Sequence, residues 1–515
     1  MPEISHNSAS SETSTVTVAT PVEIQSASSV APSAGVDSSS QRSLRGVGPF
    51  RFHFDLASFR PGRDFAERRF SIAEAMVLFV AAYLASRGLG VIRQSIFNTL
   101  FGAGSQANAY YAAFRLPDTL FNLIAGGALI QAFVPVFVSY EKEQGERETW
   151  RLASLVFNVL LVTLTALVLG GELFAPAFVG RWLVPGYSPS EQALTTTLTR
   201  IMLLQPLLLG IGSIATAILN SRRQFLLPAL SIGVYNVGLI GGLLFSLAIP
   251  GLGIYGPTFG VLAAAVCQVL VQVPGLVRQR VGYTFTWNLR HPGLREVIYL
   301  LLPNTFSVAI ISIGVIVDTA FASYLPDKAS LSAIHNAHLL FDVPLALLAQ
   351  ALGHAALPRM SELAATCHYV RLRRLIVKVV GGGVLVSIPV AVVLCVFGRP
   401  AIEILFQHGA FTKHASSLTA LALIGFALSL PGRIANELLI RGFYALKKPL
   451  PPLFTNILGF ALRIGLLLLL FRVLTGKYAI LAIPLALVGA TLIEAGLLCL
   501  FLFLSLLTMV TTPRG

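Results

Sequence analysis

From residue 72 onward, the chain alternates between apolar segments of roughly 20 residues or more and short polar segments. Segments of this length can cross a hydrocarbon core of about 30 Å. Because lipid offers no partner for backbone N–H and C=O groups, each segment is predicted to be an α-helix. The ten-residue alternation of an outer-membrane β-barrel is absent from the sequence. We predict an all-α integral membrane protein of about twelve spans, at residues 72–98, 107–138, 152–179, 194–219, 226–249, 255–277, 298–323, 331–356, 373–397, 416–443, 451–473 and 479–508.

Short matches that recur six spans apart divide these helices into two halves. The spacing of Ala, Leu and Pro in Ala128–Pro135 returns in Ala351–Pro358, and the basic pair Arg222-Arg223 returns as Lys447-Lys448. Two six-helix halves in the same orientation imply a pseudo-two-fold axis along the membrane normal and a central cavity between two lobes. The predicted parts are a lobe at 72–277, a cytoplasmic linker at 278–297 and a lobe at 298–508.

The segments outside the spans predict the orientation. Residues 1–45 have neither a basic start nor an apolar middle, so a disordered tail is expected rather than a signal peptide. A basic juxtamembrane segment follows at 46–71, and a short tail occupies 509–515. The loops after even-numbered spans carry most of the Lys and Arg, whereas those after odd-numbered spans carry few. Because Lys and Arg mark the cytoplasmic side, both termini are predicted to be cytoplasmic.

Composition agrees with membrane residence. Of the 515 residues, 55% are hydrophobic and only 12% are charged, and the mean hydropathy is +0.77. A soluble domain carries about 25% charged residues. The net charge of +14 would suggest a nucleic-acid partner in a soluble protein, but here the cations fall in alternate loops, so none is predicted.

No motif indicates catalysis, a cofactor or a metal. The cysteines Cys267, Cys367, Cys395 and Cys499 are far apart and form no CxxC or Cys/His pattern, so neither zinc nor a disulfide framework is predicted. Gly251–Gly256 fits GxGxxG, but it lies between two membrane spans without the strand–helix unit of a dinucleotide site. Walker A, HExxH and GxSxG motifs are absent from the sequence, and an enzyme is therefore the least favoured class.

Arginines in the first two spans are the leading candidates for a binding site, because a charge at mid-membrane costs about 2.5–3.5 kcal/mol or more. Arg87 and Arg93 are six residues apart, about 120° short of two full turns, and with Arg115 they predict one cationic wall of a cavity. Guanidinium groups bind phosphates through their fork geometry, so this wall favours an anionic substrate. The alternative is that Arg87 and Arg93 lie near a helix end and extend to the membrane interface.

Asp318 in the seventh span is a candidate for coupling transport to an ion. Its carboxylate could ligate Na⁺ or carry a proton, together with Asn456 in the eleventh span. The alternative is a hydrogen-bonded carboxylate that serves only helix packing. Ion coupling through these two residues stays a hypothesis of the sequence.

Two i,i+4 pairs in the spans are predicted to bond within their own helices. These are His338 with Asp342, facing the cavity or only each other, and Arg433 with Glu437. The other charged residues in the spans are Asp118, Arg200, Arg463 and Glu494.

An ordered series of short motifs resembles the MurJ/MviN family, the lipid II flippases of the multidrug/oligosaccharidyl-lipid/polysaccharide exporter superfamily. The resemblance covers about residues 72–480 and rests on the order of the motifs more than on any one of them. The motifs are Ser86–Arg93, Phe101–Gly104, Ala113–Pro117, Gly127–Pro135, Val184–Tyr187, Ala217–Asn220, Phe321–Leu325, Ala351–Gly353, Leu405–Thr412 and Gly442–Tyr444.

The resemblance implies two six-helix lobes that rock between inward-open and outward-open states in the bacterial cytoplasmic membrane. It implies a polyprenyl-pyrophosphate-linked peptidoglycan precursor as cargo, carried to the outer leaflet for cell-wall synthesis. The family's cavity arginines correspond to Arg87 and Arg93, and its basic residue before Leu-Pro corresponds to Arg115. These three would hold the pyrophosphate.

The chain departs from the family pattern at several cavity positions. The family's acidic residue early in span 2 is Asn108, and its arginine in the middle of that span falls at Phe121-Asn122. Its Asp-Arg-Leu in span 8 reads His338–Leu340, and only Asp342 keeps an acidic side chain there. Typical members also have two more C-terminal helices after the twelfth span. These departures favour two alternatives: an exporter of another lipid-linked glycan, or a non-transporting membrane scaffold.

Overall fold

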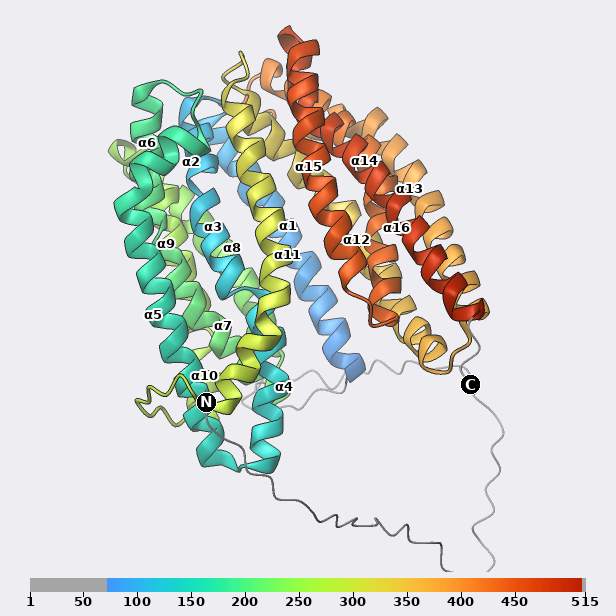
Figure 1. The fold of residues 1–515 in the computed structure, drawn as a ribbon. Helices are drawn as coiled ribbons and strands as arrows, with labels where there is room; N and C mark the ends of the chain where they lie inside the picture. The colour runs from blue at the N-terminus through green and yellow to red at the C-terminus, as the bar shows by residue number, and fades with distance from the viewer. Residues whose placement is uncertain (1–71, 512–515) are drawn as a thin grey trace, which may run out of the picture. The chain divides into compact units, whose positions relative to one another are not determined.

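The computed structural model describes residues 72–511, and the regular elements of this range are all helices, which confirms the predicted fold class (Figure 1). The predicted disordered tail and basic juxtamembrane segment lie outside the described residues, as do residues 512–515. The elements are α1 (Ile72–Phe101), α2 (Ser105–Ala113), α3 (Arg115–Ile124), α4 (Gly127–Glu143), α5 (Glu146–Phe178), η3 (Val179–Leu183), α6 (Pro189–Met202), α7 (Gln205–Ser221), α8 (Leu226–Ala248), η4 (Pro250–Leu252), α9 (Tyr255–Leu270), α10 (Val273–Arg278), α11 (Pro292–Ser323), α12 (Ser330–Ala365), α13 (Tyr369–Phe406), α14 (Lys413–Ala445), α15 (Leu450–Val473), η5 (Gly476–Leu481) and α16 (Ala482–Thr511).

The twelve predicted spans all occur, in the predicted order. Eleven segments among the described residues are long and apolar enough to cross a membrane, and α1, with 30 residues, precedes them. Several helices are longer than predicted: α13 has 38 residues, whereas the sequence predicts a span only at 373–397. The reason is that hydropathy marks only the stretch that fits the hydrocarbon core, whereas the helix continues beyond it.

The second span, predicted as one helix at 107–138, is instead divided into α2, α3 and α4. The larger break lies at Ala125 and Gly126, where Gly126 has an extended backbone with φ −67° and ψ −160°. A Cβ at Gly126 would lie 3.1 Å from the backbone of Asn122, so this close turn suits glycine. The break therefore falls inside the apolar run, where α3 ends and the chain continues as α4.

Two further spans are divided at prolines. Pro206 stands at the start of α7 and Pro274 at the start of α10. Proline has no N–H to donate to the carbonyl four residues earlier, so the preceding helix ends and a new one begins. The fourth span therefore consists of α6 and α7, and the sixth of α9 and α10.

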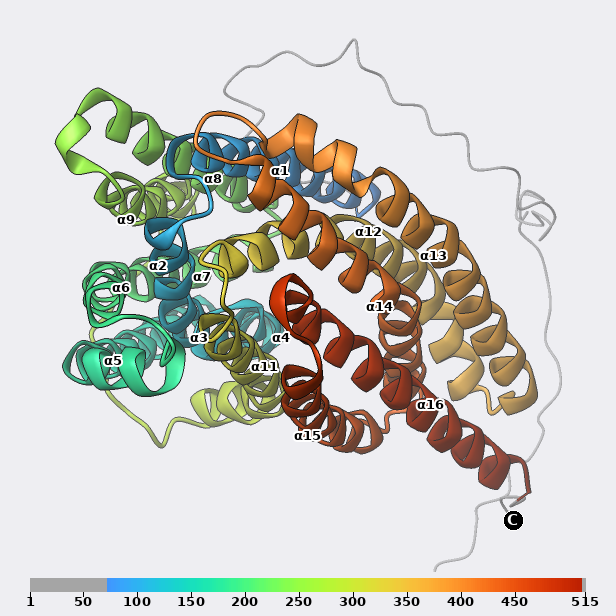
Figure 2. The ribbon, with the colours of Figure 1, turned by 90° about the horizontal axis from the view of Figure 1, so that it is seen from above.

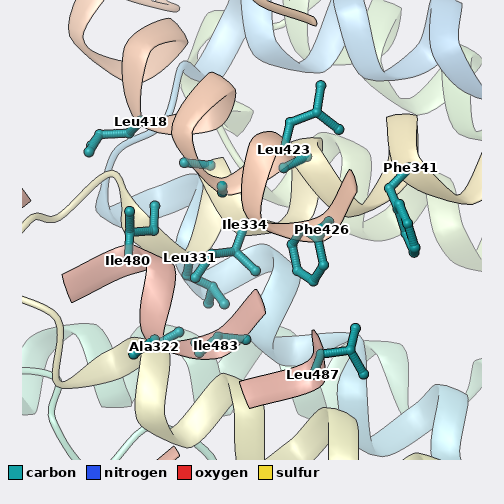
Figure 3. Packing of buried hydrophobic residues seen from close by; sticks show 14 of the residues in the cluster. Ala322, Leu331, Ile334, Phe341, Leu418, Leu423, Phe426, Ile480, Ile483 and Leu487 are labelled. Carbon is teal, nitrogen blue, oxygen red and sulfur yellow. The ribbon is translucent and has the colours of Figure 1, made fainter. Parts of the chain in front are cut away.

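We call α1–α10 the N-lobe and α11–α16 the C-lobe. In the N-lobe, α1 packs along α8, α8 along α9, and α4 and α5 against α7 (Figure 2). In the C-lobe, α14 is the central helix and packs against α12, α13 and α16. Figure 3 shows part of the apolar core there, to which Phe341 of α12, Phe426 of α14, and Ile483 and Leu487 of α16 belong.

Two basic turns predicted as repeats have the same backbone geometry. Arg223 after α7 and Lys447 after α14 both have positive φ, 61° and 56°. In each turn the next residue donates its N–H to a carbonyl five residues earlier, at 2.9 Å for Gln224 and 3.0 Å for Lys448. This Schellman arrangement satisfies carbonyls that the helix end leaves free. The same turn ends α10 at Arg280 and α12 at Cys367, so it is a general way of ending these helices, and the two-fold repeat stays a prediction.

Candidate functional site

The predicted cationic wall is formed by α1. Arg87 and Arg93 both line a cavity of about 260 Å³, together with Ser86 and Asn236 of α8. The amide of Asn236 donates to Ser86 Oγ at 2.9 Å, which fixes α8 against this part of α1. The two arginines therefore share one side of the helix, as the sequence predicted.

Arg115 joins this wall from the second span. It is the first residue of α3 and lines two cavities. The first, which we call the N-lobe cavity, is shared with Arg93 and is lined by N-lobe residues apart from His335 of α12, and the second lies between the lobes and is shared with Arg87. We call the second, of about 300 Å³, the interlobe cavity. The Nε atom of Arg115 is buried and has no hydrogen-bond partner among the described residues. A buried guanidinium with an unused donor is suited to an anionic ligand.

The opposite wall of the interlobe cavity comes from the C-lobe and carries acidic and imidazole groups. His338 and Asp342 of α12 line it, and His338 Nδ1 lies 3.0 Å from Asp342 Oδ2. This confirms the predicted i,i+4 pair, and the cavity lining shows that the pair does not only face itself. Asp342 also lines a smaller cavity with Arg87 and with Glu437 of α14. The site is thus cationic on the N-lobe side and acidic on the C-lobe side.

Asp318 lines the interlobe cavity, but its partner is not Asn456. Arg463 of α15 donates from Nη2 to Asp318 Oδ2, and both side chains are about one-fifth exposed. Asn456 lies seven residues before Arg463 on the same helix, roughly 10 Å along its axis. Asp318 thus forms a salt bridge between α11 and α15, and its coupling role together with Asn456 stays a prediction.

Amide side chains that the search for charges missed connect the two lobes. Gln94 and Asn98 of α1 donate to Asn336 Oδ1 of α12 at 2.9 and 2.8 Å, and all three are at most 2% exposed. Gln94 also donates to Tyr111 Oη at 2.6 Å, and the Tyr111 ring stacks on His335 at 4.0 Å. The sequence did carry a signal for this contact, namely uncharged amides inside apolar spans. Such groups are costly to bury unpaired, so they indicate a hydrogen-bond partner in another helix.

Asn108, predicted as part of the substrate cavity, lies in this interlobe contact, and it is not among the residues that line the four cavities described above. Its Oδ1 accepts from the backbone N–H and the hydroxyl of Ser332, at 2.9 and 2.5 Å, and its Nδ2 donates to the carbonyl of Lys328. A neutral amide both donates and accepts here, whereas a carboxylate would leave the Lys328 carbonyl without this donor. The structure therefore gives Asn108 a role in joining the lobes.

The predicted pair of Arg433 with Glu437 is not present: within the described helices α14 to α16, no ion pair joins them at 4.0 Å or less. Glu494 of α16, for which the sequence offered no account, accepts from Asn436 Nδ2 at 2.9 Å. A polar group of α14 is thus linked to α16. In the part of the chain that the structure describes, no cluster of three or more His, Cys, Asp or Glu is suited to a metal ion.

Comparison with known proteins gives a consistent relationship. The family model described as "Lipid II flippase MurJ" matches residues 97–510, a range that includes Arg115 and begins after Arg87 and Arg93. The lipid II flippase MurJ of Burkholderia cenocepacia is 32% identical over 368 residues, which are 70% of this chain and 71% of that protein. The probable lipid II flippase MurJ of Rhizobium tropici is 26% identical over 413 residues, 79% of this chain and 77% of that one.

Solved structures agree on the fold. A lipid II flippase MurJ in an inward closed conformation superposes with a TM-score of 0.71 at 23% identity, covering 85% of this chain and 94% of that chain. An inward-facing multidrug resistance MATE family transporter of the MOP superfamily gives 0.70 at 13% identity, covering 85% and 100%. On the evidence of the sequence matches, this multi-pass membrane protein belongs to the lipid II flippase MurJ family.

Proposed function

We propose that this chain moves lipid II, a polyprenyl-pyrophosphate-linked peptidoglycan precursor, from the inner to the outer leaflet by alternating access. The observation that carries the proposal is the position of Arg115, which lines both the N-lobe cavity and the interlobe cavity with an unpartnered buried Nε. Arg87 and Arg93 line the cavities on either side of it. A pyrophosphate group matches such a set of fork-shaped donors.

The interlobe hydrogen bonds support a cavity that opens toward one side of the membrane. Gln94 and Asn98 lie seven and eleven residues beyond Arg87 on α1, roughly 10 and 16 Å along the helix axis. The closed contact is therefore on the side where α1 ends, and Arg87 lies toward the side where α1 begins. In the predicted topology that side is cytoplasmic, where lipid II is made available for transport. Breaking the interlobe bonds would open the other side.

The proposed setting is the bacterial cytoplasmic membrane with both termini in the cytoplasm. The basic loops Arg222-Arg223 and Lys447-Lys448 follow even-numbered spans, as the positive-inside rule expects for this orientation. The partners we propose are the lipid-linked anionic glycan and the surrounding lipids. We propose neither an enzymatic activity nor a nucleic-acid partner.

A second substrate class has an observation in its favour. Leu339 lines the interlobe cavity at the position where the family resemblance expects an arginine. One cation fewer on the C-lobe wall changes which head group this wall can hold, and this favours another polyprenyl-linked glycan over lipid II. The same loss is compatible with a non-transporting scaffold.

Complementation tests these possibilities. The resident lipid II flippase of a bacterium is depleted, and this chain is expressed beside Arg87→Ala, Arg93→Ala and Arg115→Ala at equal membrane levels. Arg200→Ala is the control, because Arg200 is half-exposed and donates to the carbonyl of Glu172 away from the cavities. We expect rescue by the native chain and the control, and none by the three cavity variants.

Failure of the native chain at full membrane expression would contradict lipid II transport and favour the other lipid-linked substrate or the scaffold. Rescue by all three cavity variants would contradict the role of the arginines but not the transport of lipid II.

A further inference from the structure

The salt bridge between Asp318 and Arg463 has a consequence for ion coupling. The sequence nominated Asp318 as a carboxylate that could ligate a coupling Na⁺ or carry a proton. In the structure its Oδ2 accepts from Arg463 Nη2, a guanidinium that belongs to the same lobe. A guanidinium has five donors and no acceptor, and it stays charged at any accessible pH. The carboxylate therefore already has a permanent cation at bonding distance.

A glycine on α11 makes room for the Arg463 guanidinium, whose Nε is buried and has no hydrogen-bond partner among the described residues. Gly314 lies one turn before Asp318 on α11, and a Cβ there would lie 3.3 Å from Arg463 Nη1. Glycine in a helix interior costs helix stability, so a buried glycine in mid-helix indicates a packing requirement. Here the missing side chain leaves the space that the guanidinium occupies. Arg463 is about one-fifth exposed and reaches Asp318 from α15, outside the residues that line the interlobe cavity.

With Arg463 in place, the surroundings of Asp318 do not fit a metal cation. A bound Na⁺ needs several oxygen ligands, and hard cations take carboxylate, carbonyl and amide oxygens. The other cavity-lining residues on this part of α11 are Val315 and Thr319, and the hydroxyl of Thr319 bonds to the carbonyl of Val315 at 2.8 Å. A second cation beside Asp318 would also be repelled by Arg463.

We propose that Arg463 is a tethered counter-ion that replaces a coupling metal cation at Asp318, so that this carboxylate binds no Na⁺ during the transport cycle. Its charge moves with the C-lobe, whereas a free ion would be exchanged with the solution. Asp318 then balances a fixed charge beside the cavity and leaves Arg115 on the facing wall for the anionic substrate. The transport part of this inference rests on the proposed function, whereas the ion-binding part does not.

Sodium binding is measured on the purified full chain by thermal unfolding in sodium chloride against choline chloride at equal ionic strength. We expect the native chain and Arg463→Lys, which keeps a tethered cation, to unfold at the same temperature in both salts. Arg463→Gln frees the carboxylate, and its unfolding temperature should rise by about 2–4 °C as Na⁺ increases a hundredfold. Asp318→Asn with Arg463→Gln should lose that rise.

Sodium-specific stabilisation of the native chain that disappears in Asp318→Asn would overturn the proposal, and this measurement does not depend on whether Arg463→Gln folds. Absence of any sodium response in a folded Arg463→Gln would also overturn it, because the freed carboxylate would then form no cation site. These readouts require no transport, so they remain decisive if lipid II is not the substrate. In an active transport assay, the native rate should not change when choline replaces sodium.

Discussion

Asn98 of α1 and Asn336 of α12 bond to each other through both ends of their amides, although 238 residues separate them. Asn98 Nδ2 donates to Asn336 Oδ1 at 2.8 Å, and Asn336 Nδ2 donates to Asn98 Oδ1 at 3.4 Å. Neither side chain is exposed. Because one residue belongs to each lobe, this pair must separate if the lobes move apart at this end.

Replacing Asn336 by leucine should favour separation of the lobes. The change leaves the buried Asn98 Nδ2 without its acceptor, which costs about 1–3 kcal/mol, whereas Gln94 Nε2 keeps Tyr111 Oη and Asn98 Oδ1 as acceptors. That energy corresponds to a change of roughly 5- to 150-fold in the ratio of closed to open molecules. Spin labels at Ser190 and Lys413, both exposed, report the distance between the lobes.

We expect a population at longer distance in Asn336→Leu. Ser213→Ala is the control, since Ser213 is buried and its hydroxyl bonds only to Leu209 of its own helix. Identical distance distributions in Asn336→Leu and the native chain would show that the amides do not hold the lobes together.

Close packing of α8 and α9 depends on one of two adjacent glycines. A Cβ at Gly242 would collide with the backbone of Gly260 and lie 3.0 Å from the carbonyl oxygen of Gly256, whereas a Cβ at Gly241 would meet open space. Small residues allow membrane helices to approach in this way. Gly242→Ala should therefore cost about 1–3 kcal/mol, by overpacking.

The measurement is thermal unfolding in detergent followed by tryptophan fluorescence. Gly242→Ala should unfold several degrees below the native chain, while Gly241→Ala should match it or unfold slightly higher because alanine favours helix. Equal effects of the two substitutions would refute the packing argument.

The sequence predicted the number, order and type of the spans because lipid imposes a strict requirement on every apolar segment. The helix ends and the breaks inside spans were harder to predict. Gly126 ends α3 within a continuous apolar run, and only its local backbone geometry distinguishes it from glycines that α-helices contain, such as Gly241. Pro206 and Pro274 did carry a signal for a break, which hydropathy alone does not use.

The candidate site was predictable in kind and in the i,i+4 pair of His338 with Asp342, but not in the pairing between helices. Arg87, Arg93 and Arg115 stood out because charge is rare in apolar spans, and the structure places all three on cavities. The partner of Asp318 could not be predicted, because Arg463 is 145 residues away and the spans are apolar on every side. Facing directions in such helices come from tertiary packing, which no local pattern records.

Arg115→Lys should bind a pyrophosphate ligand more weakly although it keeps the positive charge. Lysine lacks the planar fork and the Nε donor, which in Arg115 is buried and unpartnered. Loss of one charge-assisted hydrogen bond predicts affinity lower by roughly ten- to hundredfold. Native mass spectrometry of the full chain with undecaprenyl pyrophosphate measures the bound fraction.

The control for this substitution is Arg200→Lys, which makes the same chemical change at a half-exposed arginine outside the cavities. Its bound fraction should equal that of the native chain. Equal binding by Arg115→Lys would mean that charge alone, without fork geometry, accounts for recognition at this position.

His291 should make the stability of the α11 start depend on pH. Its Nδ1 accepts from the N–H of Gly293 at 3.2 Å, and burial lowers the pKa of this imidazole below its ordinary value of 6.5, Arg151 adding to the effect and Glu148 opposing it. The folded state thus favours the neutral ring, while the unfolded chain takes up a proton near pH 6.5. The stability that this group contributes is present above pH 6.5 and is lost as the pH falls from there through the lowered pKa of the folded state.

His291→Asn keeps a good N-cap without a titrating ring, so the variant should lose less stability than the native chain between about pH 7.5 and 5.5. His368→Asn is the matched control, because His368 precedes α13 in the same way but makes no capping bond with its side chain. Thermal unfolding at each pH gives the slopes. If His291→Asn lost stability with falling pH as steeply as the native chain, the pH dependence would belong to other groups. The same conclusion would follow if His368→Asn reduced the slope equally, because only the difference between the two variants isolates the cap at His291.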